Sequence, residues 1–228
     1  MKRSEVNAII RQAEEFIRSF NFMLPPFASW TPAEFKSRKH EAHNVIAARL
    51  GWDITDFGRG KFNEFGIALF TLRNGSAADL SKGRGMLYAE KLLICRLKQV
   101  TPNHRHNIKT EDIINRGGGR FSLELHMSGP DGMPDPKAEV EVPCDGVMRR
   151  VPAGGHITLG PGESITLQPG VWHSFWVDDP RVLMGEVSTV NDDVTDNVFA
   201  EPIGRFAKIE EDEPPYRLLV ADYDQFLR

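Results

Sequence analysis

Three histidines and one glutamate carry the clearest chemical signal in this 228-residue sequence. His104 and His106 stand two positions apart, and on a β-strand that spacing points both imidazoles to one face. Glu111 follows shortly afterwards, and His173 comes much later, after a glycine-rich turn that leads into a run of β-type residues. A strand pairing that places His173 opposite the first two histidines would gather all four side chains at one point.

The types of these four side chains predict a metal site. Neutral imidazoles and a carboxylate suit borderline divalent metals, and the set alone accepts manganese, iron, cobalt or zinc. Four protein ligands leave room for water or substrate when the metal is five- or six-coordinate. We therefore expect one divalent metal, bound by His104, His106, Glu111 and His173, in a site that can carry out catalysis.

Short runs of β-type residues surround these positions, and Gly/Pro turns separate them. This pattern predicts a closed or sandwich-like β architecture. The runs are Leu92–Cys95, Phe121–Met127, Ala138–Val142, His156–Leu159, Ser164–Leu167, Ser174–Val177 and Val182–Val187. We expect a last strand at Tyr216–Val220.

The residues before these runs have a helical pattern. Apolar residues recur at helical spacing from Lys2 to Phe20, and Thr31-Pro32 has the form of an N-cap that begins a second helix, running to about Leu50. We predict that residues 1–86 form a helical extension that packs on the barrel, and that residues 87–228 form the β-barrel and a C-terminal tail. The apolar stripe of the first helix must cover either the barrel wall or another subunit.

The four expected metal ligands lie in motifs that resemble those of a known protein family. His104-x-His106-x4-Glu111-x5-Gly117, followed by Gly162-x7-Gly170-x2-His173, resembles the two signature motifs of the cupin superfamily. One HxH is common by chance, whereas the pair of motifs at this separation is not. The resemblance implies a mainly β fold: a jelly-roll-like cupin β-barrel, here with an N-terminal α-helical extension.

A longer stretch resembles the cupin sugar isomerases typified by D-lyxose isomerase. The residues that carry this similarity are Val100–Gly119, the preceding Tyr88–Leu93, and the later Gly185–Asp193 and Ile209–Glu213. The resemblance implies a metal-dependent aldose–ketose isomerase that usually uses manganese and often forms dimers. We therefore expect interconversion of D-lyxose and D-xylulose, with D-mannose and D-fructose as a further pair.

Isomerisation through an enediol needs a group that moves a proton between C1 and C2, beside something that polarises the sugar oxygens. The first candidates are Lys109, which lies between two expected ligands, and Glu186, a carboxylate in an otherwise apolar run. Lys91 and Arg217 are candidates for binding the sugar. Glu186 points inward with its apolar neighbours if its strand stays regular.

Composition excludes several other classes of function. The net charge is -4, and no Lys/Arg block is dense enough for nucleic-acid binding. No apolar run approaches the ~18 residues of a membrane span, and the first twenty residues lack a signal-peptide core. With two cysteines in the chain, we expect a soluble cytoplasmic protein. The apolar N-terminal stripe and the β core make a homodimer the expected assembly.

Two other functions are compatible with the same ligands. Three histidines and a glutamate also hold ferrous iron, as in a cupin dioxygenase, and oxygen consumption would identify that class. A non-catalytic sugar-binding cupin would bind sugar without turnover. The N-terminal helices lack a basic recognition face, which disfavours a DNA-linked regulator.

Overall fold

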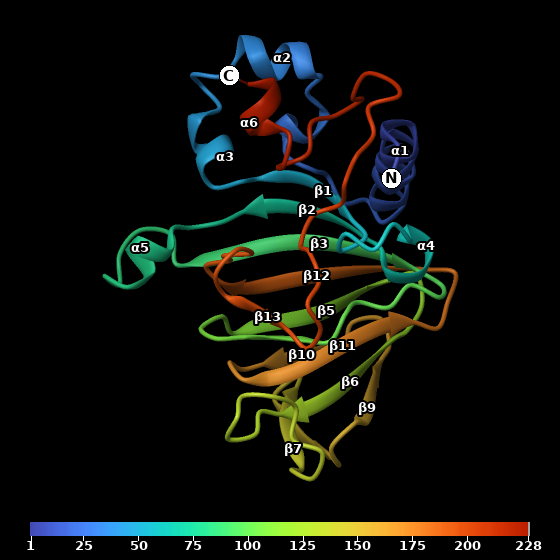
Figure 1. The fold of residues 1–228 in the computed structure, drawn as a ribbon, viewed down its shortest axis with the longest axis vertical. Helices are drawn as coiled ribbons and strands as arrows, with labels where there is room; N and C mark the ends of the chain where they lie inside the picture. The colour runs from blue at the N-terminus through green and yellow to red at the C-terminus, as the bar shows by residue number, and fades with distance from the viewer. Residues whose placement is uncertain (228) are drawn as a thin grey trace.

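Two antiparallel sheets face each other in the computed structural model, which describes residues 1–227. One sheet has the strand order β1-β2-β3-β12-β5-β10 and the other β13-β4-β11-β6-β9, and β7 and β8 form a separate hairpin. Figure 1 shows the barrel below a group of helices. The strands are β1 (Gly51–Thr55), β2 (Ile67–Arg73), β3 (Tyr88–Arg96), β4 (His104–His106), β5 (Glu111–Gly117), β6 (Phe121–Met127), β7 (Val140–Cys144), β8 (Val147–Val151), β9 (Gly155–Leu159), β10 (Ser164–Leu167), β11 (Val171–Val177), β12 (Arg181–Thr189) and β13 (Asn197–Phe199).

The main core fills the space between the two sheets. Leu123 and Leu125 of β6 and Phe175 of β11 face Leu93 of β3 and Ile113 of β5, and all five are buried. Because successive residues of a strand point to opposite faces, one face of each sheet supplies this core. The mainly β, cupin-type barrel that the sequence predicts is therefore present, and all seven predicted β-type runs lie wholly or largely within strands.

Helix α1 (Arg3–Ser19) covers the outer face of the first sheet. Its residues Val6, Ile10 and Ile17 are buried against Phe70 of β2 and Leu92 of β3. At the start of the helix, the backbone N–H of Lys2 donates to Glu5 Oε2 at 2.8 Å. The expected apolar stripe thus packs on the barrel wall. Among the described helices, none is long and apolar enough to cross a membrane.

The remaining helices are short. They are η1 (Pro26–Ser29), α2 (Pro32–Ser37), α3 (His43–Ala47), α4 (Phe62–Phe65), α5 (Ala77–Leu80) and α6 (Tyr223–Phe226). Helix α2 begins at the predicted N-cap, since Thr31 Oγ1 accepts a hydrogen bond from the backbone N–H of Glu34. The single helix expected up to Leu50 is wrong, because turns separate α2 from α3.

The prediction that residues 1–86 are a helical extension is corrected by β1 and β2. Both strands lie in this region, and β2 is hydrogen bonded to β3, so they extend the barrel sheet. Their residues are buried on both faces, with the barrel interior on one side and α1 on the other. The mostly apolar run of β2 shows no alternation of apolar and polar residues, so its sequence lacks the pattern of a half-exposed strand, and β1 has only five residues.

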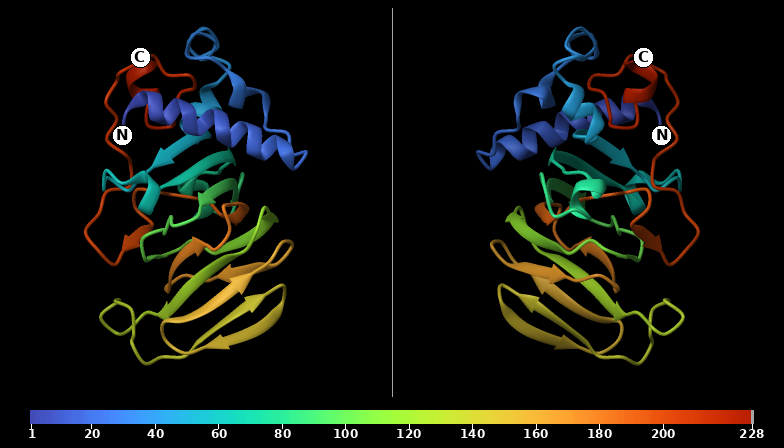
Figure 2. Two further views of the ribbon diagram at one scale, coloured as in Figure 1. Left: turned by 90° about the vertical axis from the view of Figure 1, so that its right-hand side faces the viewer. Right: turned by 90° about the vertical axis from the view of Figure 1, so that its left-hand side faces the viewer.

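The C-terminal tail returns to the first helix. Arg3 is fully buried and pairs with Glu211 at 2.6 Å and with Asp222 at 2.9 Å. The strand expected at Tyr216–Val220 is wrong, because this segment makes turns and one isolated bridge, from Leu219 to Trp52. Figure 2 shows that α1 and the returning tail lie together at the helical end of the molecule.

Candidate functional site

The strand register brings the three histidines together. His104 of β4 lies directly opposite His173 of β11, and their ring centroids are 4.2 Å apart. His106 follows on the same face of β4. One nitrogen from each ring lies within 4.8 Å of the others, so this group can hold a metal ion. Gly170, with φ at +84°, makes the left-handed turn that leads into β11, a conformation in which a side chain would be strained.

The ring nitrogens are arranged as in a metal site. Nδ1 of His104 contacts the carbonyl of Pro102 at 2.8 Å, and Nδ1 of His173 contacts the carbonyl of Val171 at 3.0 Å. A ring whose Nδ1 donates to a carbonyl keeps its Nε2 lone pair free for a metal. His106 is buried, yet neither of its ring nitrogens has a hydrogen-bond partner among the described residues. Buried polar atoms without partners are rare, and a ligated cation would satisfy one of them.

Glu111, the first residue of β5, lies beside two of these histidines. Its Oε1 lies 3.3 Å from Nε2 of His106 and 3.2 Å from Nε2 of His173. The contact with His106 is a close approach without hydrogen-bond geometry. The three histidines have the donor types and mutual distances that a borderline divalent metal needs, and a carboxylate oxygen lies next to two of them.

The electrostatics hold these groups in the forms that bind metals. Burial lowers the pKa of His104 well below its usual value, and the neighbouring His173 and His106 lower it further. Burial likewise lowers the pKa of His106, although Glu111 partly opposes this. Burial alone would raise the pKa of Glu111, but Lys109 and His106 outweigh it, and that pKa lies well below its usual range. Neutral imidazoles beside an ionised carboxylate are ready to bind a cation.

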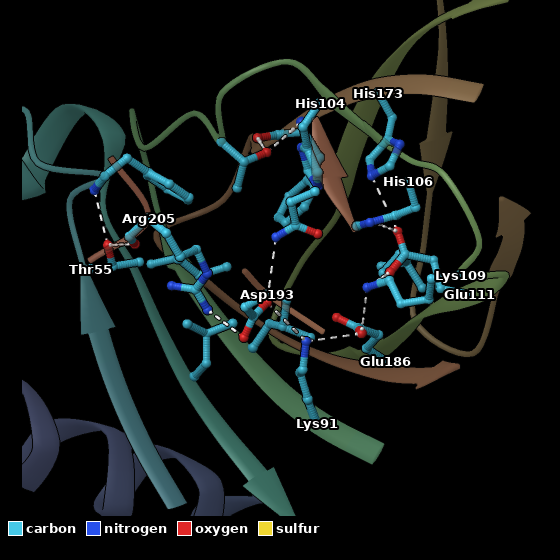
Figure 3. A pocket seen from close by; sticks show the side chains of 18 of the residues that line it. Thr55, Lys91, His104, His106, Lys109, Glu111, His173, Glu186, Asp193 and Arg205 are labelled. Atoms are coloured by element: carbon cyan, nitrogen blue, oxygen red, sulfur yellow. Dashed lines mark hydrogen bonds and ion pairs between the residues drawn. The ribbon is translucent and has the colours of Figure 1, made fainter. Parts of the chain in front are cut away.

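Two lysines and a second carboxylate extend the site. Glu186 on β12 lies directly opposite Lys91 of β3 in the strand register, with Lys91 Nζ 3.2 Å from Glu186 Oε1. Lys109 Nζ lies 3.0 Å from the same oxygen and 2.5 Å from Oε2 of Glu111. Figure 3 shows the Glu186 carboxylate between the two lysines. The four side chains form a buried row of alternating charge.

This row fixes the charge of its members. Burial alone would raise the pKa of Glu186, but Lys109 and Lys91 outweigh it and lower that pKa. Burial would lower the pKa of Lys109, but Glu111 and Glu186 outweigh it and raise that pKa. Glu186 is therefore an ionised carboxylate that can accept a proton, and Lys109 is a cation that can donate a hydrogen bond.

These residues line one cavity. It brings together most of the side chains that the sequence singled out, namely Lys91, His104, His106, Lys109, Glu111, His173 and Glu186. Arg217 lies outside it, which corrects its expected place at the sugar. Its Nε donates to Glu14 Oε1 at 3.0 Å, and its guanidinium stacks on the Tyr216 ring.

The cavity wall also contains a second group of charged residues that the sequence did not predict. Arg205 lies 2.8 Å from Asp53 and 3.1 Å from Asp193, and Asp193 in turn lies 3.9 Å from Lys91. Burial would raise the pKa of Asp193, but Arg205 and the two lysines outweigh it and lower that pKa. Asp193 ends a segment that resembles the sugar isomerases, which is a usable signal, whereas Arg205 lies in a loop without a motif.

The fold and the site together define a cupin-type barrel with a buried three-histidine metal-type centre. Similar folds occur in L-ribose isomerases. The structure of the Cellulomonas parahominis L-ribose isomerase with L-psicose has a TM-score of 0.57 and 16% identity, and covers 92% of this chain and 98% of that chain. The Acinetobacter sp. DL28 L-ribose isomerase in complex with L-ribose has a TM-score of 0.54 and 13% identity, and covers 91% and 98%.

The chain belongs to the D-lyxose isomerase family, whose model matches residues 1–223. It is 46% identical to the D-lyxose/D-mannose isomerase of Serratia proteamaculans over all of both chains, and 44% identical to that of Escherichia coli O157:H7 over 99% of this chain and 100% of the other. The protein is thus a sugar isomerase of this family. Of the functions that the sequence left open, family membership favours the isomerase over the dioxygenase and the non-catalytic cupin.

Proposed function

We propose that this protein is a metal-dependent aldose–ketose isomerase that interconverts D-lyxose and D-xylulose, and D-mannose and D-fructose. One observation carries the mechanism: the ionised Glu186 lies between two lysines in the same cavity as the three histidines. The names of these two relatives, D-lyxose/D-mannose isomerase, support the choice of sugars.

The metal ligands in this proposal are His104, His106, Glu111 and His173, and manganese is the preferred ion. When bound, a divalent ion would supply a Lewis acid that polarises adjacent oxygens of the open-chain sugar. The three imidazoles and the carboxylate are the donor types that accept manganese, iron, cobalt and zinc, so cellular availability contributes to the choice.

Glu186 moves the carbon-bound proton in this proposal. Its carboxylate takes the proton from C2 of the aldose, exchanges it with solvent and protonates C1, while O1 gains the proton that O2 loses, so that an enediol forms and becomes the ketose. Lys109 stays protonated and donates a hydrogen bond to the sugar oxygen on which negative charge develops, and Lys91 holds Glu186 and binds a sugar hydroxyl. Because both lysines lie within about 3 Å of Glu186, they keep it ionised until the substrate arrives.

An isotope experiment tests the proposed chemistry. Metal-stripped protein is incubated with D-lyxose in D2O, with and without added Mn2+, and both sugars are analysed by NMR. Ketose that forms only with metal and carries solvent deuterium at C1 supports proton transfer by a side chain. Ketose without deuterium would indicate a hydride shift, and no ketose despite bound Mn2+ would contradict the proposed function.

The assembly and location are part of the same proposal. We propose a cytoplasmic homodimer, for which the buried free thiols of Cys95 and Cys144 fit a reducing compartment. Sedimentation equilibrium of the purified protein tests the dimer, and a monomer at micromolar concentration would contradict it.

A further inference from the structure

Asp196 connects the strand of the metal-type histidines to the segment that follows β12. Strand β13 pairs with β4, so that Asn197 lies opposite His106 and Phe199 opposite His104. Asp196 immediately precedes β13 and is 6% exposed. The histidine strand is therefore held between β11 on one side and this segment on the other.

The carboxylate of Asp196 holds the turn between His106 and Glu111. Its Oδ1 accepts hydrogen bonds from the backbone N–H groups of Asn107 at 3.0 Å and Ile108 at 2.7 Å, and its Oδ2 accepts one from Lys109 at 2.9 Å. Three successive amides bound to one buried carboxylate fix the path of this turn. The turn sets how far Lys109 and Glu111 lie from the histidine pair.

Asp196 also lies beside the ring nitrogen of His106 that faces away from Glu111. His104 and His173 each direct Nδ1 to a backbone carbonyl, whereas Nδ1 of His106 is buried without a hydrogen-bond partner among residues 1–227. Asp196 Oδ2 is 3.9 Å from this nitrogen. That separation is an electrostatic contact and becomes a hydrogen bond only if the two groups move closer.

We propose that Asp196 is a positioning residue for the metal centre. It holds Lys109 and Glu111 at their places through the turn, and its carboxylate faces Nδ1 of His106, on the side of the ring where carboxylates support metal-binding histidines. This inference rests on the proposed metal dependence of the enzyme. It adds a residue that touches neither the metal nor the sugar.

Metal affinity in the absence of sugar tests the proposal. Asp196→Asn keeps the size of the side chain but removes the charge and replaces one acceptor oxygen with a donor. We expect Mn2+ to bind about 10- to 100-fold more weakly, measured by the electron paramagnetic resonance signal of free Mn2+. The absorption spectrum of the Co2+-loaded variant should differ from that of the wild type, since the ligand geometry changes.

Asp192→Asn is the matched control. Asp192 belongs to the same segment, but its carboxylate accepts hydrogen bonds from Val194 and Thr195 within its own turn. This variant should bind Mn2+ as the wild type does and give the wild-type Co2+ spectrum.

Thermal unfolding of the metal-free proteins separates positioning from stability. If Asp196→Asn unfolds at a lower temperature while its folded form keeps wild-type Mn2+ affinity and Co2+ spectrum, the residue supports the fold alone and the proposal is overturned. Weaker Mn2+ binding by Asp192→Asn to the same degree would also overturn it. A wild-type protein that binds no Mn2+ would overturn the proposed function, and this inference with it.

Discussion

Lys109 and Glu186 form an ion pair at 3.0 Å in which the side chains are 4% and 5% exposed. Charges so deeply buried are tolerated because each has a partner on either side, in the order Lys91, Glu186, Lys109, Glu111. Removal of one member leaves an uncompensated charge in a medium of low polarity, which costs more than an exposed pair would. The row therefore contributes both to stability and to the chemistry of the cavity.

Glu186→Gln is expected to remove nearly all isomerase activity. The amide is close in size to the carboxylate but cannot accept the proton from the sugar, so kcat should fall by about 10²- to 10⁴-fold. Mn2+ affinity should change little, because Glu186 is not among the proposed ligands. Glu90→Gln, in a partly exposed pair with Arg73 on the neighbouring strand, is the control and should retain activity. Wild-type kcat in Glu186→Gln would exclude this residue as the base.

Lys109→Met should destabilise the metal-free fold. The change leaves Glu111 and Glu186 facing each other without the cation between them, and breaking a buried pair costs about 3–5 kcal/mol. Urea unfolding measures the loss. The double variant with Glu186→Gln should be less destabilised than the sum of the two single variants, since they share one interaction. Additive losses would show that the pair is not coupled.

Stability should fall as the pH is lowered through the range in which free histidine titrates. Burial lowers the pKa of His104 and of His106 in the folded chain, so below about pH 6.5 the unfolded chain binds more protons than the folded one. The free energy of unfolding therefore decreases below that pH, by up to about 1.4 kcal/mol per pH unit for each group, and is fully retained above it.

Urea unfolding of the metal-free protein between about pH 5 and 8 checks this dependence. His104→Gln should flatten it, whereas His156→Gln should not, because the His156 side chain is 52% exposed. The lowered pKa values of Glu111 and Glu186 act in the same direction at lower pH, since their contribution is present above about pH 4.3 and is lost on acidification. If the free energy of unfolding depends on pH equally in His104→Gln and in the wild type, His104 is not a source of this pH dependence.

Arg217→Ala should lower stability and leave catalysis unchanged. Its guanidinium binds Glu14 of α1 and stacks on the Tyr216 ring, outside the cavity. Loss of this partly buried pair should cost on the order of 1 kcal/mol, measured as a lower melting temperature. The KM for D-lyxose should stay at the wild-type value. A raised KM would instead indicate that Arg217 contributes to sugar binding.

The convergence of the three histidines could be predicted because their spacing acts through local geometry. The separation of His104 and His106 fixes a shared strand face, and the turn at Gly170 begins the strand that bears His173. Strands β6 and β10 matched their predicted bounds because apolar and polar residues alternate along them. For these elements, a short stretch of sequence is sufficient to predict the structure.

Other features depend on pairings across the chain. β2 is a mostly apolar run buried on both faces, so it lacks the alternation that marks a half-exposed strand, and β1 has only five residues. Arg217 was expected at the sugar because no local pattern indicates its partner Glu14, about two hundred residues earlier. Arg205 enters the cavity wall through Asp53 and Asp193, from two other parts of the chain. Spacing along the sequence does not encode such contacts.

The contact between Arg3 and Asp222 affects the order in which the chain can fold during its synthesis. These residues are separated by 219 positions, and Arg3 also binds Glu211. While the ribosome is still making the barrel, α1 has emerged but its two acidic partners do not yet exist. Its apolar face can dock on β2 and β3, but the buried guanidinium stays uncompensated until the tail appears. The ion pairs at the helical end therefore form only after the segment that carries Glu211 and Asp222 has been synthesised.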